Sequence, residues 1–326
     1  MFPFAFSKAA DERAALAAGR RGARYIAGGT TLIDLMRETV ERPESVVDIT
    51  GLPYRLIGCG PAGLRIGALV TMADLAADRQ VRSRYPVISQ ALELSASAQL
   101  RNKATIGGNL LQRSRCTYFR DVTAPCNKRA PGSGCGALEG DNRMHAILGG
   151  SQSCVATHAS DVAVAFIALG ATVELRDPDR RIRKVPLDAF YRQPGGTPHV
   201  ENDLRPGELI TAVTVPAGPY TQRSGYLKVR DRQSYEFALT SAAVAMEITG
   251  GRIRSARVAA GGVGTVPWRL SAVEQALIGR RPGADTWQAA AARAADGAKP
   301  LAHNEFKVEL LRRTIARQLE TIGGTR

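Results

Sequence analysis

One stretch of the chain, residues 112–150, shows neither helical nor strand periodicity, and it constrains the fold more than any other feature. It is rich in Gly, Arg and Asn and contains Cys116, Cys126 and Cys135, and Cys154 follows shortly after it. A structureless segment of this length is uncommon in a compact domain unless something other than a hydrophobic core organises it. We therefore expect the four thiols to share a partner that holds the segment in place.

Three kinds of partner could join these thiols, which are spaced C-x9-C-x8-C-x18-C. Structural disulfides need an oxidising compartment, and the apolar residues 1–6 run into charged residues too soon to form an export signal. Zinc sites usually include a close pair of cysteines, which this spacing lacks. A 4Fe–4S cluster accepts four thiolates from widely spaced positions. The spacing favours the cluster over zinc and disulfides.

The charges around the cysteines fit the same interpretation. Six basic side chains flank the thiols in sequence and would offset the negative charge of a thiolate-bound cluster: Arg113, Arg115, Arg120, Lys128, Arg129 and Arg143. The fifth cysteine, Cys59, lies far from the group in sequence. We expect it to be a small buried hydrophobic residue.

The overall composition excludes several classes of protein. The 326 residues are 44 % hydrophobic and 23 % charged, without a heptad or triplet repeat, which is typical of a folded chain rather than a coiled coil, a collagen or a disordered segment. No apolar run approaches the roughly 18 residues of a membrane-spanning helix. The net charge of +14 permits nucleic-acid binding, but the basic residues are scattered and form no stripe with interleaved aromatics.

Two glycine-rich loops suggest a site for an anion. The strand predicted at 25–27 runs into Gly28-Gly29-Thr30-Thr31, and a helix is predicted directly after it. Glycines let an anion approach the backbone amides, and the two hydroxyls can donate to phosphate oxygens. The segment Thr105-Ile106-Gly107-Gly108-Asn109 repeats this chemistry with a hydroxyl, two unhindered amides and an Asn side chain. Two such loops in one domain could hold a pyrophosphate from both sides.

Two further motifs have a structural interpretation beside the functional one. The segment 58–63 matches G-x-G-x-x-G, but Pro61 interrupts it and a strand follows instead of a helix, so we expect a turn between two strands. Ser160 and Asp161 could accept hydrogen bonds from a ribose hydroxyl or a flavin ring N–H. They could equally form the N-terminal cap of the next helix.

The remaining patterns predict an α+β chain with a composition change near 217–224. Before that change we expect helices at 12–18, 32–42, 71–77, 86–98 and 161–169, and strands at 25–27, 45–49, 56–57, 64–66, 171–175 and 209–215. After it we expect strands at 226–229, 237–248 and 253–260, followed by helices at 270–277, 285–295 and 304–322. Strands followed by helices indicate an α+β C-terminal domain.

Taken in order, Ala27-Gly28-Gly29-Thr30, Thr105-Ile106-Gly107-Gly108-Asn109 and Ser160-Asp161 resemble the FAD-binding subunit of the xanthine dehydrogenase family of molybdenum hydroxylases. The likeness includes Gly207-Glu208-Leu209-Ile210 and Tyr226-Leu227-Lys228-Val229-Arg230 and covers nearly the whole chain. Most members run directly from the Gly-Gly-Asn loop to the Ser-Asp pair, whereas this chain inserts the cysteine segment between them. It is most similar to the FAD and 4Fe–4S subunit of bacterial periplasmic aldehyde oxidoreductases, and 4-hydroxybenzoyl-CoA reductase has a similar insertion.

The resemblance implies an α+β fold in two domains. A two-part FAD-binding domain of the vanillyl-alcohol-oxidase (PCMH) type would occupy residues 1–220, with subdomains 1–55 and 56–220 and a 4Fe–4S insertion at 112–155. A smaller α+β C-terminal flavoprotein domain would occupy residues 221–326.

The resemblance also implies the cofactor-binding residues. Cys116, Cys126, Cys135 and Cys154 would hold a 4Fe–4S cluster, and Lys228 would place a cation beside the flavin ring, where it stabilises the anionic reduced form. The residues implied for FAD are Ile26, Ala27, Gly28, Gly29, Thr30, Thr31, Leu32, Thr105, Gly107, Gly108, Asn109, Leu111, Ser160, Asp161, Ile210 and Lys228.

The implied function is electron transfer within a molybdenum-dependent aldehyde oxidoreductase. Electrons would pass from a molybdenum-cofactor large subunit and a 2Fe–2S small subunit to FAD and on to an external acceptor. This chain would carry no catalytic residue besides the flavin, would not oxidise substrate alone, and would bind neither nucleic acid nor membrane. A signal-bearing partner would export it to the periplasm; otherwise it would be cytoplasmic. The alternatives are a self-contained flavin oxidase, which leaves the cysteines without a purpose, and a basic metal-binding nucleic-acid module.

Overall fold

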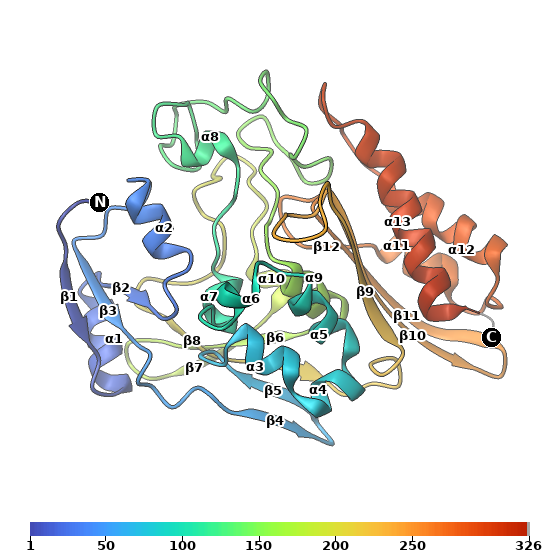
Figure 1. Ribbon diagram of the computed structural model, residues 1–326, viewed down its shortest axis with the longest axis horizontal. Coiled ribbons are helices and arrows are strands. Elements are labelled where there is room, and N and C mark those ends of the chain that lie inside the picture. The colour runs from blue at the N-terminus through green and yellow to red at the C-terminus, as the bar shows by residue number, and fades with distance from the viewer. Residues whose placement is uncertain (325–326) are drawn as a thin grey trace.

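The computed structural model describes residues 1–324, which contain three separate β-sheets (Figure 1). The first is a parallel sheet in the order β1-β3-β2, formed by β1 (Ala5–Lys8), β2 (Arg24–Ile26) and β3 (Ser45–Asp48). Helices α1 (Glu12–Arg20) and α2 (Leu32–Arg37) make the connections. The sequence patterns predicted both helices and the last two strands, but the predicted end of the second helix at residue 42 is wrong. Helix α2 ends at Arg37, and Thr39 has φ +61°, which a helix does not accommodate. The patterns missed β1, because all four of its residues are exposed and so carry no alternation of apolar and polar positions.

The second sheet has five antiparallel strands in the order β4-β5-β8-β6-β7. They are β4 (Ile57–Gly60), β5 (Gly63–Gly67), β6 (Thr172–Arg176), β7 (Ile182–Pro186) and β8 (Leu209–Pro216). The G-x-G-x-x-G segment is a turn between β4 and β5, as predicted. Gly63 ends that turn with φ +130°, and a Cβ there would lie 2.1 Å from the carbonyl oxygen of Val215.

Short helices cover the second sheet: α3 (Met72–Ala77), α4 (Arg79–Arg84), α5 (Pro86–Glu93), α6 (Ala98–Arg101), α7 (Ile106–Leu110), α9 (Asp161–Ala168) and α10 (Leu187–Phe190). The single helix predicted at 86–98 is wrong, because α5 ends at Glu93. The Ser95 hydroxyl bonds back to the Ala91 carbonyl oxygen at 2.7 Å, and Ala96 has φ +48°. Hydroxyl side chains offer the backbone such alternatives to helix continuation.

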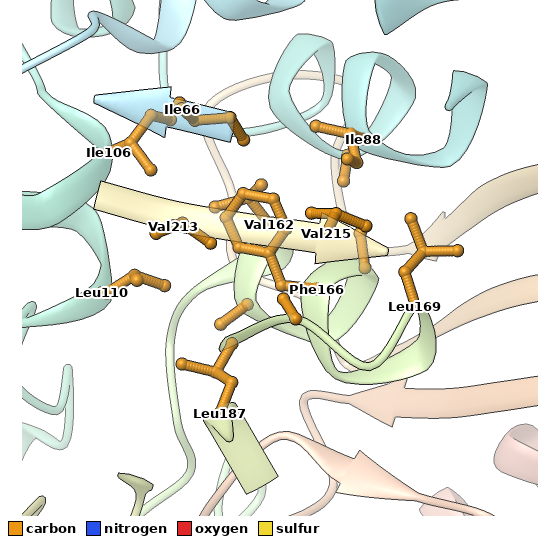
Figure 2. Close-up of a cluster of buried hydrophobic side chains, with 14 of the residues drawn as sticks. Ile66, Ile88, Ile106, Leu110, Val162, Phe166, Leu169, Leu187, Val213 and Val215 are labelled. Atoms are coloured by element: carbon orange, nitrogen blue, oxygen red, sulfur yellow. The ribbon is translucent and has the colours of Figure 1, made fainter. Parts of the chain in front are cut away.

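Helix α9 lies at the centre of the largest core (Figure 2). All eight of its residues are buried, which explains why this stretch of sequence is apolar without an amphipathic period. Phe166 packs among Val213 of β8, Ile88 of α5 and other aliphatic side chains. Burying a side chain of this size contributes roughly 1.5–3 kcal/mol relative to leaving it in water. This core fixes the position of the residues at the start of α9.

The third sheet has the antiparallel order β12-β11-β10-β9 and forms the C-terminal part of the chain. Its strands are β9 (Ser224–Val229), β10 (Thr240–Thr249), β11 (Arg252–Gly261) and β12 (Trp268–Arg269), and α11 (Ser271–Leu277), α12 (Ala284–Ala291), η1 (Ala292–Ala295) and α13 (Phe306–Gly323) follow. These helices cover the outer face, while α5 and α9 pack toward the other (Figure 1). Strands followed by helices were predicted, and only the two-residue β12 was missed.

The segment between α7 and α9 is irregular, as predicted, and contains only the short helix α8 (Thr117–Arg120). It lies at the opposite end of the molecule from the β4–β5 hairpin (Figure 1). Phe119 packs on Leu35 of α2, which attaches the segment to the first sheet. In residues 1–324, none of the helices combines the length and the apolar character needed to cross a membrane.

Candidate cofactor sites

A cleft of about 800 Å³ separates the loop after β2 from the loop that begins at Thr105. This volume suits a large organic cofactor. Ten of the predicted FAD residues line it: Ile26, Ala27, Gly28, Gly29, Thr30, Thr31, Leu32, Thr105, Gly108 and Leu111. The cleft therefore brings together the two glycine-rich loops that lie far apart in the sequence.

The first loop offers free backbone donors. Within residues 1–324, the amides of residues 28–31 donate no hydrogen bond to the protein. Gly29 has φ +71°, a conformation that favours glycine. A Cβ on Gly28 would lie 1.9 Å from the carbonyl oxygen of Lys103, which is backbone of the facing loop. Gly28 is thus required for the two loops to approach each other, and the free amides suit anionic oxygens.

The second loop differs from its predicted form. Residues 106–110 make up helix α7, and the Thr105 hydroxyl caps it by accepting from the Gly108 amide at 3.3 Å. The Gly107 amide donates to the carbonyl oxygen of Ala68 at 2.8 Å. The expected pair of unhindered amides is therefore absent, because the Gly108 amide is used in the cap of α7 and the Gly107 amide joins α7 to the residue after β5. Gly107 and Asn109 do not line the cleft, and Asn109 instead accepts from the Ser160 hydroxyl.

Asp161 belongs to a buried polar cluster beside a second cavity of about 240 Å³. Its carboxylate accepts from Lys228 Nζ at 2.8 Å, from the Tyr226 hydroxyl at 2.7 Å and from the Ser95 hydroxyl at 3.0 Å. Ser160 caps α9 by accepting from the Ala163 amide at 3.1 Å, so the structural interpretation of this residue is confirmed. We call this second cavity, lined by Ser160, Asp161, Tyr226 and other residues, the Asp161 pocket.

The pairing of Asp161 with Lys228 was not anticipated. The side chains are 8 % and 1 % exposed, so the two charges neutralise each other out of contact with solvent. Burial and the Asp161 charge raise the pKa of Tyr226 well above its usual value, which keeps its hydroxyl a donor. Ile210 lies in β8 within the main core and lines neither cavity.

Sequence reasoning missed His158, which lines both the cleft and the Asp161 pocket. Its ring meets Tyr191 edge-on at 4.5 Å between centroids, and its Nδ1 accepts from the Ser160 amide at 3.3 Å. Burial lowers the pKa of His158 to about 4, so the ring is neutral. A single histidine between Thr157 and Ala159 carries no pattern, and no signal in the sequence could have singled it out.

The four predicted cysteine ligands line one small cavity, which we call the cysteine cavity. Cys126 and Cys135 face each other on an antiparallel bridge, Cys154 bridges to Ser151, and Cys116 stands before α8. All five cysteines are free thiols, and Cys59 lies apart on β4. Within residues 1–324, no three His, Cys, Asp or Glu side chains are placed to hold a single metal ion.

The cysteine cavity is mainly apolar. Lys128 is its one charged lining residue in the described part of the chain. Burial raises the pKa of Cys116 to about 12. Burial also raises the pKa of Cys154, while Lys128 opposes that shift. The thiols of Cys116 and Cys154 are therefore protonated unless a bound cation compensates for the loss of the proton.

The three cavities share walls. Cys154, Lys128 and Ala156 line both the cysteine cavity and the cleft. Cys116 lines the cysteine cavity and the Asp161 pocket. Two groups bound in the cleft and in the cysteine cavity would thus be separated by single side chains.

Comparisons with known proteins identify the FAD-binding part of the chain. Residues 2–218 match the FAD binding domain in molybdopterin dehydrogenase, and residues 225–322 match the CO dehydrogenase flavoprotein C-terminal domain. The aldehyde oxidoreductase FAD-binding subunit PaoB of Escherichia coli (strain K12) is 51 % identical over 306 residues, 93 % of this chain and 92 % of that protein. The carbon monoxide dehydrogenase medium chain of Afipia carboxidovorans is 26 % identical, covering 94 % and 93 %.

Solved structures share the fold. A reconstituted CO dehydrogenase from Oligotropha carboxidovorans aligns with a TM-score of 0.77 at 22 % identity over the full length of both chains. Quinoline 2-oxidoreductase from Pseudomonas putida 86 aligns with a TM-score of 0.76 at 22 % identity, covering 99 % of this chain and 98 % of that one. The predicted α+β architecture and the family resemblance are both confirmed. The chain belongs to the FAD-binding medium subunits of the xanthine dehydrogenase and CO dehydrogenase family.

Proposed function

We propose that this chain is the FAD and 4Fe–4S electron-transfer subunit of a molybdenum-dependent aldehyde oxidoreductase. The observation that carries the proposal is the shared wall between the cleft and the cysteine cavity, because electron transfer requires its two centres to be close. The 51 % identity with the aldehyde oxidoreductase subunit PaoB favours an aldehyde as the substrate of the complex. A self-contained flavin oxidase would need no cavity lined by four cysteines.

The residues of the cleft fit FAD. The amides of residues 28–31 donate to no described protein group and, together with Thr30 and Thr31 of the cleft lining, would bind the pyrophosphate. Bound FAD supplies the ability to accept and release one or two electrons. The chain would orient it, with the neutral His158 in the wall that the cleft shares with the Asp161 pocket. Asp161 lines that pocket, whereas its partner Lys228 lines neither cavity.

The residues of the cysteine cavity fit a 4Fe–4S cluster. Zinc sites usually include a close pair of cysteines, which the C-x9-C-x8-C-x18-C spacing lacks. A cube presents one iron at each of four corners and so takes thiolates that surround a small volume. Four thiols, a cavity wall without a carboxylate and one lysine together suit a cluster of negative net charge.

The partners in this proposal are a molybdenum-cofactor large subunit and a 2Fe–2S small subunit, with an external electron acceptor. The names of the relatives, an FAD-binding subunit and medium chains, support a multi-subunit enzyme. We also propose a periplasmic location, reached by co-export with a partner that carries the signal.

Cofactor analysis of the complex, purified without oxygen, tests the function. We expect about one acid-released flavin per copy of this chain, and about four irons and four sulfides per copy in addition to those of the 2Fe–2S subunit. A zinc-containing preparation without flavin would refute the proposal.

A matched pair of variants tests the ligands. Cys126→Ala removes a lining thiol of the cysteine cavity and should lose these irons while FAD is retained. Cys59→Ala changes a thiol on β4, away from the cavity, and should lose neither cofactor. Full iron in the Cys126 variant would exclude that residue from the ligand set.

A further inference from the structure

His145 is the one residue of the described chain whose side-chain nitrogen contacts the sulfur of a cysteine in the cysteine cavity. Its Nε2 lies 3.1 Å from Cys116 Sγ. His145 lines the Asp161 pocket but not the cysteine cavity. The ring therefore contacts the sulfur from the side of the Asp161 pocket and does not occupy the cysteine cavity.

The backbone at His145 is held by the C-terminal part of the chain. Its carbonyl oxygen accepts from Lys307 Nζ at 3.1 Å and from Asn304 Nδ2 at 3.2 Å. Lys307 is fully buried on α13, and its second bond goes to the carbonyl oxygen of Gly262 at 2.8 Å. The His145 amide donates to the carbonyl oxygen of Asn142. These bonds fix the backbone position of His145, so the contact of its ring with Cys116 is preorganised.

The two nitrogens of the ring differ in their surroundings. Within residues 1–324 its Nδ1 has no hydrogen-bond partner, whereas Nε2 faces the sulfur. A sulfur bound to iron carries no hydrogen, so a bond between the two requires the ring proton to be on Nε2.

We infer that His145 is a positioning residue for the proposed cluster, with its Nε2–H donating to the ligand sulfur of Cys116 and raising the cluster's reduction potential. The inference rests on the proposed function, because it takes Cys116 as an iron ligand. Hydrogen bonds to ligand sulfurs are among the factors that set these potentials. The donor partly neutralises charge on the sulfur and so favours the more negative, reduced state of the cluster.

His145 is the one side-chain donor to these sulfurs among the described hydrogen bonds. The other donors are backbone amides: Ala156 lies 3.5 Å from Cys154 Sγ, and Tyr118 and Phe119 bond to Cys116. The His145 bond is also well placed for its effect, since Cys116 is the cysteine that lines the Asp161 pocket as well as the cysteine cavity. A change at His145 should thus act on the cluster without disturbing the cleft.

Three variants of the intact complex test the inference. His145→Phe keeps an aromatic ring but removes the donor, and His145→Gln retains an N–H. His303→Gln alters an exposed histidine that contacts the same segment only through its backbone amide. Iron, sulfide and flavin are assayed, and the cluster's midpoint potential is followed by electron paramagnetic resonance during an anaerobic redox titration.

We expect His145→Phe to keep its iron and shift the cluster's potential downward, with the flavin potential unchanged, and His145→Gln to recover much of that shift. His303→Gln should match the unmodified complex. An unchanged potential in an iron-replete His145→Phe complex overturns the inference and leaves the proposed function intact. If that variant loses iron, restored iron and potential in His145→Gln support the inference, and an equally iron-poor His145→Gln overturns it. An unmodified complex without the additional irons overturns the proposed function itself.

Discussion

Substituting Gly28 by Ala should abolish FAD binding, and the reason is visible in the backbone of the cleft. The added Cβ would lie 1.9 Å from the carbonyl oxygen and 2.6 Å from the carbonyl carbon of Lys103. Ordinary contact begins near 3.4 Å, so the two loops must separate by about 1.5 Å. Backbone cannot rotate away as a flexible side chain can, so the overpacking cost should reach the upper part of the usual range, about 3 kcal/mol. Separated loops no longer present the amides of residues 28–31 beside the facing loop.

The assay is acid-released flavin per chain in the purified complex, together with the melting temperature. Gly58→Ala is the benign control, because a Cβ there meets nothing within 4 Å. Gly63→Ala is the destabilising control, because its Cβ would lie 2.1 Å from the Val215 carbonyl oxygen in a hairpin that does not line the cleft. We expect Gly63→Ala to lower the melting temperature and keep flavin below it, and Gly28→Ala to lose flavin. Full flavin and an unchanged melting temperature in Gly28→Ala would refute the reasoning.

Three further predictions concern stability, each measured by denaturant unfolding. Asp161→Asn leaves Lys228 buried without its counter-charge and should lower the free energy of unfolding by about 3–5 kcal/mol. Adding Lys228→Met should recover part of this loss. A loss below about 1 kcal/mol would contradict the prediction. Burial and the Arg143 charge lower the pKa of Lys307 to about 7. Between pH 7 and 10 the unfolded chain therefore binds more protons than the folded chain, so the free energy of unfolding should rise with pH relative to that of Lys307→Met. Parallel pH profiles of the two proteins would exclude this. Asp78→Ala removes the cap of α4 and should cost about 1 kcal/mol, whereas Asp78→Ser should not.

Sequence patterns predicted the helices and strands whose apolar residues are buried. They failed where individual hydrogen bonds or backbone conformations determine where an element forms or ends. The apolar run of α9 and the period of α13 were found, since burial selects those residues. Strand β1 was missed because it is paired by its backbone alone and exposes every side chain. The break between α5 and α6 depends on the Ser95 hydroxyl and a positive φ at Ala96, and neither has a period.

The same contrast holds at the candidate sites. The lack of pattern in residues 112–150 correctly indicated an irregular segment, and the four cysteines line a common cavity. The two glycine-rich loops face each other across one cleft, as predicted, but the amides of the second loop donate hydrogen bonds to other groups of the protein. The pairing of Asp161 with Lys228 joins residues from α9 and β9, and His145 meets Cys116 through a fold that no local spacing encodes. Such contacts depend on tertiary packing.

The irregular segment also has a mechanical consequence, because it is fastened to three parts of the molecule. Arg120 pairs with Glu38, which directly follows α2, at 2.8 Å. Arg113 pairs with Glu41 beside the first sheet and with Glu201 before β8, both at 2.6 Å. Asn304, just before α13, bonds to the carbonyl oxygens of Asn142 and His145.

These contacts reach the first sheet, the second sheet and the C-terminal helices from a segment that has almost no secondary structure of its own. Rotation of one part against another would have to break several of them at once, including the half-buried double ion pair of Arg113. The position of the cysteine cavity relative to the cleft is therefore held by residues of the same irregular segment that forms most of the cavity wall. In the function proposed above, a cluster that orders this segment would also fix the spacing between the cleft and the cysteine cavity.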